Sequence, residues 1–297
     1  MAPKEVLTYA PTDRTVDRWL QRTLGQVGEQ LAEQRDRLFE LAQLQRHHVV
    51  LDINAGSGLL TKEALRRVPE GGVYAITRTL AQANALQEQF SALPELIRPS
   101  VLSATLTELP NVLVTQAPDV RFDRIIGRNA LVHEPDKVAT VQCLAKLLRQ
   151  SGVLVLAETI PRHTQRLYRL LDPKKLDGDL YERLVAAEEA IYASSSDPMV
   201  NWDADDLRVA IDAAGLVVEV TIEQNSTLMH VTPALLERWF ASTAATTKER
   251  PTYAQHLARF LKAAEVRTVQ DLFTRFLLHQ TVTWSSTIAF VQATMLT

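Results

Sequence analysis

Short apolar segments alternate with longer amphipathic ones along most of this chain, and this alternation restricts the possible folds more than any other feature. The short segments are rich in Val, Ile and Leu, as buried strands of a parallel sheet are. The longer segments have the apolar spacing of helices that cover such a sheet. The predicted strands are 48–52, 73–76, 100–103, 122–127, 153–157, 216–222 and 281–291, and the predicted helices between them are 59–68, 80–93, 136–148 and 203–214. The pattern therefore predicts an α/β fold with a mostly parallel, seven-stranded sheet covered by helices on both faces.

Other segments interrupt this alternation with helical patterns. Residues 12–46 have helical apolar spacing after the cap candidates Thr12 and Asp13, so 1–47 is predicted to be an N-terminal helical segment. Residues 161–201 follow the fifth strand and are predicted to be a polar, largely helical insertion within a domain of 48–297. Residues 233–278 are a further predicted helical block, in which 241–251 is the expected mobile loop.

The composition is that of an ordinary soluble globular protein and excludes several classes of function. The 297 residues are 46% hydrophobic and carry 32 Lys and Arg against 35 Asp and Glu, so any contact with nucleic acid is expected to be local. The single Cys143 excludes an intramolecular disulfide and a multi-cysteine metal site. The seven histidines are dispersed, so no metal site is expected. Neither a long apolar run nor a signal peptide is present, which predicts a cytoplasmic protein without membrane contact.

The most informative stretch is the Gly-rich turn after the first predicted strand. Asp52 ends that strand, and Gly56 and Gly58 let the backbone approach a ligand before the next helix begins. Open α/β sheets bind nucleotides at such a turn, beyond the carboxyl end of the strand. A tight strand-to-helix turn without a ligand is the alternative interpretation of the same residues.

The order of the later elements resembles the class I S-adenosylmethionine-dependent methyltransferases. Residues 52–58 look like the acid-x-Gly-x-Gly-x-Gly loop of that family, and 122–131, 147–158 and 202–219 resemble its later strand and helix blocks. The resemblance implies a Rossmann-like sandwich and methyl transfer to an unknown acceptor. It implies that the cofactor-binding residues are Asp52, Asn54, Ala55, Gly56, Ser57, Gly58, Thr77 and Arg78. It makes Arg128, Asn129 and Glu158 the candidate catalytic residues.

Several positions depart from the pattern of that family. Asn54 replaces the first glycine of the loop, where its side chain would crowd or hydrogen-bond the methionine moiety of the cofactor. The second strand ends in Thr77 and Arg78 instead of the acid that binds the ribose hydroxyls. Losing that acceptor costs about 1.5–3 kcal/mol, or roughly tenfold or more in affinity. The cofactor site is therefore predicted to be degenerate and the enzyme weak or inactive. A nucleotide phosphate held by Arg78 is a further alternative.

A closer resemblance covers nearly the whole chain. The runs 41–74, 158–168 and 195–203 look like a cyanobacterial methyltransferase-like domain that follows a RarA-type (MgsA) AAA ATPase, a clamp-loader relative acting at stalled replication forks. The resemblance implies a partner of that kind in replication or recombination, and a non-catalytic docking domain as the alternative to a methyltransferase. The Gly-x-x-x-x-Gly-Lys-Ser/Thr motif is not present in the sequence, so this chain is not expected to hydrolyse ATP.

A cluster of basic residues lies inside the predicted insertion. Arg162, Arg166 and Arg169 are its candidate substrate-binding or partner-binding residues, and an anionic substrate or a nucleic-acid backbone would suit them. The alternative is a solvated helix face, paired with the acids of the same segment. Those acids are Asp172, Asp177 and Asp179.

Overall fold

The computed structural model describes residues 14–194, 197, 199–241 and 251–295, with side chains from residue 28 onward. Thr12, Asp13 and most of the loop 241–251 lie outside the described residues. Helix α1 (Arg14–Ala42) ends before residue 46 because Gln43 adopts a left-handed φ of 44°. The amide of Gln43 donates to the carbonyl of Phe39 (3.2 Å), which closes the last turn of the helix.

The sheet has seven strands, as the sequence predicts. They are β1 (Val49–Asp52), β2 (Gly72–Thr77), β3 (Ser100–Ser103), β4 (Phe122–Arg128), β5 (Leu148–Thr159), β6 (Leu216–His230) and β7 (Thr281–Met295). Their order in the sheet is β3-β2-β1-β4-β5-β7-β6, and β7 runs antiparallel to both of its neighbours. Because β1 lies between β2 and β4, the turns after these three strands meet at one edge of the sheet.

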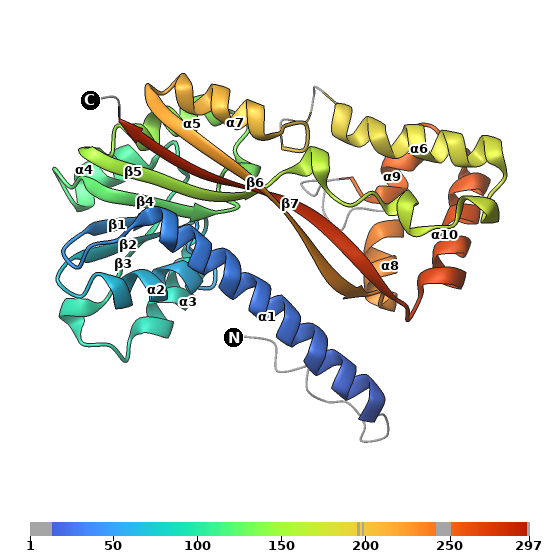
Figure 1. Cartoon of the computed structure of the whole chain (residues 1–297), viewed down its shortest axis with the longest axis horizontal. Helices are drawn as coiled ribbons and strands as arrows, with labels where there is room; N and C mark the ends of the chain where they lie inside the picture. Colours follow the sequence, from blue (N-terminus) through green and yellow to red (C-terminus); the bar gives the residue numbers. More distant parts are fainter. Residues whose placement is uncertain (1–13, 195–196, 198, 242–250, 296–297) are drawn as a thin grey trace.

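Helices cover both faces of the sheet (Figure 1). They are α2 (Leu59–Arg67), α3 (Leu80–Phe90), α4 (Leu109–Gln116), α5 (Lys137–Ala145) and α7 (Ala204–Asp212). α1, α2 and α3 pack on one face, and α4, α5 and α7 pack on the other. The sequence pattern missed α4, which lies in what was expected to be a long connection, although Leu109 and Leu113 bury its apolar side. α5 is shorter than the predicted 136–148, since Leu148 already pairs with Phe122 as the start of β5.

The last two strands form a hairpin that extends well beyond the sheet. β6 and β7 pair continuously from Leu216 with Met295 to His230 with Thr281, whereas β5 pairs only with residues 288–294 of β7. β6 is therefore much longer than the predicted 216–222. Its outer half is polar and lacks the apolar alternation that indicates a strand, but pairing with β7 satisfies its backbone groups.

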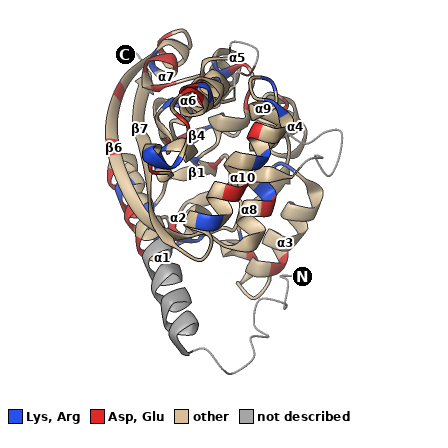
Figure 2. Cartoon of the chain, turned by 90° about the vertical axis from the view of Figure 1, so that its right-hand side faces the viewer, with Lys and Arg blue, Asp and Glu red and all other residues tan. Residues whose placement is uncertain are grey.

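The outer half of this hairpin carries a separate helical cluster with its own apolar core (Figure 1). The insertion supplies η4 (Pro161–His163), η5 (Leu167–Leu170), η6 (Pro173–Lys175) and α6 (Gly178–Ala193), and the later block supplies α8 (Pro233–Phe240), α9 (Tyr253–Leu257) and α10 (Ala263–Leu277). Leu184, Phe240, Leu257 and Phe273 are buried in this core. Figure 2 shows acidic and basic residues interspersed on α6, α8 and α10. Within the described residues, none of the helices is both long and apolar enough to cross a membrane.

Candidate functional site

The Gly-rich turn after β1 is held in shape by two left-handed glycines. Gly56 has a φ of 51° and Gly58 a φ of 80°, conformations that favour glycine. A Cβ at Gly58 would lie 2.9 Å from the Cδ1 atom of Leu86, so glycine is also required there for packing against α3. Gly56 and Ser57 are exposed, and a Cβ at Gly56 would make only an ordinary contact with the carbonyl oxygen of Asn54 (3.7 Å). The backbone of these two residues is therefore accessible to a ligand.

Asp52 lies directly behind this turn and is completely buried. One carboxylate oxygen accepts a hydrogen bond from the Thr61 hydroxyl (2.8 Å), and the other accepts one from the amide of Asn54 (3.3 Å). Burial raises the pKa of Asp52 to about 6, while these two donors oppose the shift. The carboxylate thus ties the turn to α2.

The side chain of Asn54 joins the turn after β1 to the turn after β4. Its amide nitrogen donates to the carbonyls of Arg128 (2.9 Å) and Asn129 (3.1 Å). The sequence could not decide whether this side chain would crowd or bind a cofactor. In the structure it is a clamp between two neighbouring turns.

Glu158 is the last residue but one of β5 and is also completely buried, so it is not a solvated carboxylate. It accepts hydrogen bonds from the amides of Ala130 (2.7 Å) and Leu131 (3.2 Å), at the start of η3 (Leu131–His133). Burial raises the pKa of Glu158 to about 7, and these amides limit the rise. Asn129 is similarly occupied, since its side-chain oxygen accepts from the amide of Thr159 (2.9 Å).

Arg128 differs from these neighbours because its side chain is not held by a contact among the described residues. Within the described residues its guanidinium makes no hydrogen bond or ion pair, although Glu158 and Asp52 both attract it electrostatically. Partial burial lowers the pKa of Arg128, and the two carboxylates oppose that effect. A partly buried guanidinium beside exposed backbone amides can bind a carboxylate.

The end of β2 is closed by contacts within the chain. Thr77 is buried, and its hydroxyl donates to the carbonyls of Thr79 (3.2 Å) and Leu102 (3.3 Å). The Arg78 guanidinium donates to the carbonyl of Ala130 (3.2 Å) and pairs with Glu134 (3.2 Å). Since β1 lies between β2 and β4, this ion pair spans the edge of the sheet above Asp52.

Glu134 was not predicted as the partner of Arg78. Both residues follow strands that end at this edge of the sheet, and their positions after those strands could have predicted that they lie close together. Lys137 was also missed. It is buried, donates to the carbonyl of Glu134 (3.1 Å) and lies 5.0 Å from the ring centre of Trp202.

The three arginines of the insertion share one polar cavity of about 350 Å³ with the β6–β7 hairpin. Arg162 pairs with Asp203 (2.6 Å), and Arg169 donates to the Tyr168 hydroxyl (3.2 Å). Arg166 is only 7% exposed, pairs with Glu189 (3.0 Å) and stacks on the ring of Tyr192. These partners differ from the three acids that the sequence suggested, Asp172, Asp177 and Asp179, of which the first two cap η6 and α6 and the third pairs with Arg183.

No family model matches this chain. A search of curated proteins finds a methyltransferase from Streptomyces halstedii, GfsG, which is 27% identical over 157 residues. That match covers 52% of this chain and 51% of GfsG, so the chain spans about half the length of this relative.

Solved structures match much more of the chain. The YcgJ protein of Bacillus subtilis has a TM-score of 0.53 and 15% identity, over 90% of this chain and all of its own. The BH2331 protein of Bacillus halodurans, assigned as a methyltransferase, has a TM-score of 0.52 and 14% identity, over 87% of this chain and 97% of its own. The fold is that of the class I S-adenosylmethionine-dependent methyltransferases. A closeness to the methyltransferase-like domain of RarA-type ATPases stays a prediction.

Proposed function

We propose that this chain is an S-adenosylmethionine-dependent methyltransferase with a weakened cofactor site and an acceptor yet to be identified. The observation that carries the proposal is the environment of Arg128, a partly buried cation with no hydrogen bond or ion pair among the described residues. It ends β4, which pairs with β1, and the turn after β1 exposes Gly56 and Ser57. The similarity to GfsG supports methyl transfer in preference to another use of the fold.

The residues present fit the amino-acid end of this cofactor. Arg128 would bind the carboxylate of the cofactor's methionine moiety. The exposed turn at Gly56 and Ser57 would contact the amino-acid backbone atoms of that moiety. When bound, the cofactor supplies a methyl group on a sulfonium, which is already activated for transfer. Glu158 and Asn129 act as positioning residues, since their side chains hold the turn that carries Arg128.

The residues at the end of β2 fit the ribose poorly. Thr77 uses its hydroxyl within the chain, and Arg78 is paired with Glu134 across the crevice. No carboxylate from β2 faces the position of the ribose hydroxyls. We therefore expect an affinity at least tenfold weaker than a site with that carboxylate would have. The pairing of Arg78 also argues against its use as a phosphate ligand.

Isothermal titration of S-adenosylmethionine and S-adenosylhomocysteine, with NADPH for comparison, tests the proposal. Arg128→Met should weaken binding at least tenfold, because a charge-assisted hydrogen bond is lost. Arg121→Met is the matched control, since Arg121 is exposed at the opposite end of β4 and should have no effect. Gly56→Trp should abolish binding by filling the accessible turn. A folded protein that binds neither compound would refute the proposal.

A non-catalytic docking domain for a RarA-type AAA ATPase is the second candidate. The ion pair between Arg78 and Glu134 favours it, because it fills part of the crevice with side chains of the protein itself. Under this proposal the chain ignores the cofactor and binds the ATPase or single-stranded DNA. Arg169→Glu should then weaken that binding, while Arg275→Glu, on α10 and outside the lining of the cavity that holds Arg169, should not. Surface plasmon resonance with both partners would measure the difference.

A further inference from the structure

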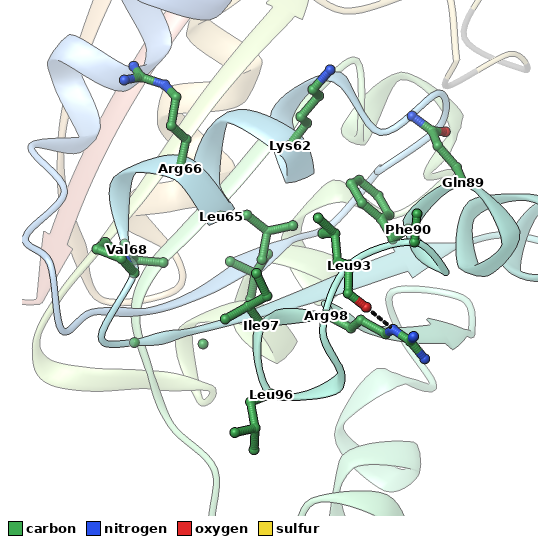
Figure 3. A pocket seen from close by; sticks show the side chains of 15 residues that line it. Lys62, Leu65, Arg66, Val68, Gln89, Phe90, Leu93, Leu96, Ile97 and Arg98 are labelled. Atoms are coloured by element: carbon green, nitrogen blue, oxygen red, sulfur yellow. Dashed lines mark hydrogen bonds between the residues drawn. The ribbon is translucent and has the colours of Figure 1, made fainter.

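A separate cavity of about 430 Å³ lies between α2, α3 and η2 (Glu95–Ile97) (Figure 3). Its described lining comes from α2, the end of α3, η2 and the start of β2, and includes no residue of 52–58 or 77–78. It is therefore distinct from the crevice of the proposed cofactor site. Its volume is in the range of small-molecule binding sites.

The walls of this cavity are apolar. Leu65 belongs to α2 and Val68 directly follows it. Phe90 ends α3, and Leu93 and Ile97 follow in the connection to β3. Figure 3 shows Leu65, Leu93 and Ile97 close together across the cavity, whereas Leu96 points away from them. A hydrocarbon chain that covered such a lining would remove apolar surface from water, which lowers the free energy.

The rim of the cavity is basic. Lys62, Arg66 and Arg98 line it, and its lining contains no carboxylate. Arg66 pairs with Glu63 (2.7 Å), which also pairs with Arg67 (2.6 Å). Arg98 donates to the carbonyls of Leu93 and Ser91 (2.7 and 2.6 Å), which fix its position without neutralising its charge.

The ammonium of Lys62 is also uncompensated, since it makes no hydrogen bond or ion pair within the part of the chain that the structure describes. Two positive charges, on Lys62 and Arg98, thus border an apolar space that contains no negative charge. The complementary ligand has a hydrocarbon body and one anionic end.

We infer that this cavity binds an anionic amphiphile, a medium-length alkyl chain that ends in a carboxylate. The alkyl chain lies among Leu65, Leu93 and Ile97, and the carboxylate lies at the rim near Lys62. The inference does not depend on the proposed methyltransferase activity, because the two sites share no lining residue.

Isothermal titration of the full chain with decanoate and with decanol tests the charge requirement. Decanoate should bind more tightly than decanol. Lys62→Glu should weaken decanoate binding about fivefold and leave decanol binding unchanged, because only the carboxylate meets the reversed charge. Lys146→Glu, an exposed lysine after α5, is the matched control and should change neither affinity. A wild-type protein that does not bind decanoate would overturn the inference.

A second pair of variants tests the cavity itself. Ala92 is exposed and lines the cavity, so Ala92→Trp should fill it and abolish binding of both compounds without disturbing the core. Ala85→Trp introduces the same side chain at an exposed position of α3 outside the lining and should have no effect. Circular dichroism checks that both variants fold. If decanoate binds Ala92→Trp as tightly as the wild type, it binds outside this cavity and the inference is wrong.

Discussion

Asp52 and Glu158 show how buried charges shape the candidate site at the scale of single residues. Both carboxylates lie at the ends of strands, both are completely buried, and each accepts hydrogen bonds from a neighbouring turn. Burial of an ionised carboxylate is costly, and hydrogen-bond donors offset only part of that cost. The two side chains therefore hold the turns of the crevice in place, at the expense of a raised pKa.

Glu158 leads to a prediction about pH. Because burial raises its pKa from the usual 4.5 to about 7, the folded state binds more protons than the unfolded state between these two values. The free energy of unfolding should therefore fall as the pH rises from 4.5 to 7. Glu158→Gln should lose this dependence, so that the wild type weakens relative to the variant by about 1–3 kcal/mol over the window. Urea unfolding at several pH values measures this, and a constant difference between the two proteins would contradict it.

Asn54 gives a second prediction, for a neutral side chain. Asn54→Ala removes two hydrogen bonds between neighbouring turns and should lower the free energy of unfolding by about 1–2 kcal/mol. Asn54→Asp keeps the shape but places a carboxylate against two carbonyl oxygens, so at pH 7 it should be more destabilising than Ala. Thermal unfolding compares both variants, and an Asn54→Asp protein as stable as the wild type would contradict the prediction.

At the scale of elements, the crevice is formed by the turns after β1, β2 and β4, and an ion pair connects the outer two. A ligand that occupies the position above Asp52 must compete with the contact between Arg78 and Glu134. A partly exposed ion pair contributes little to stability, about 0.2–1 kcal/mol. Breaking this ion pair should therefore cost a ligand only a small part of its binding free energy.

We expect Arg78→Ser to raise the affinity for S-adenosylmethionine, by up to about fivefold, because the ion pair no longer has to break. The pair formed by Arg149 and Asp123 serves as a matched control, since its side chains are 48% and 12% exposed against 38% and 11% for Arg78 and Glu134. Arg149→Ser removes a similar contact at the other end of β4 and β5 and should leave the affinity unchanged. Weaker binding by Arg78→Ser would instead make Arg78 a cofactor ligand.

At the scale of the whole molecule, two apolar cores are joined by one long hairpin (Figure 1). The cores of the sheet involve residues of β1–β7 and the flanking helices, whereas the core of the helical cluster comes from 167–187 and 231–277. Strands β6 and β7 continue from the sheet into the cluster, and Val282 and Trp284 pack there. Regions with separate cores can open at different free energies.

A pair of core substitutions tests this separation. Phe273→Ala in the helical cluster and Phe122→Ala in the sheet each remove a completely buried ring, at a cost of about 3–5 kcal/mol. Phe273→Ala should speed hydrogen exchange in α8, α9 and α10 while β1 and β4 keep their protection. Phe122→Ala should speed exchange in the strands. Faster exchange throughout the chain in both variants would show that the two cores unfold as one unit.

The sheet could be predicted from the sequence alone, because apolar runs of strand length and helical spacing are local patterns. It predicted all seven strands, the helices α2, α3, α5 and α7, and the turn with Gly56 and Gly58. It also placed Asp52, Arg128 and Glu158 at strand ends, where they meet at one edge of the sheet.

The contacts of these side chains could not be predicted in this way, because they depend on how distant segments fold together. Arg78 and Glu134, Asn54 and the carbonyl of Arg128, and the two segments of the helical cluster are far apart in the sequence. The outer half of β6 is polar, and its strand conformation depends on pairing with β7. Hydrogen bonds and ion pairs between distant segments leave no periodic signal, because each depends on where the chain returns in space and not on the residues beside it.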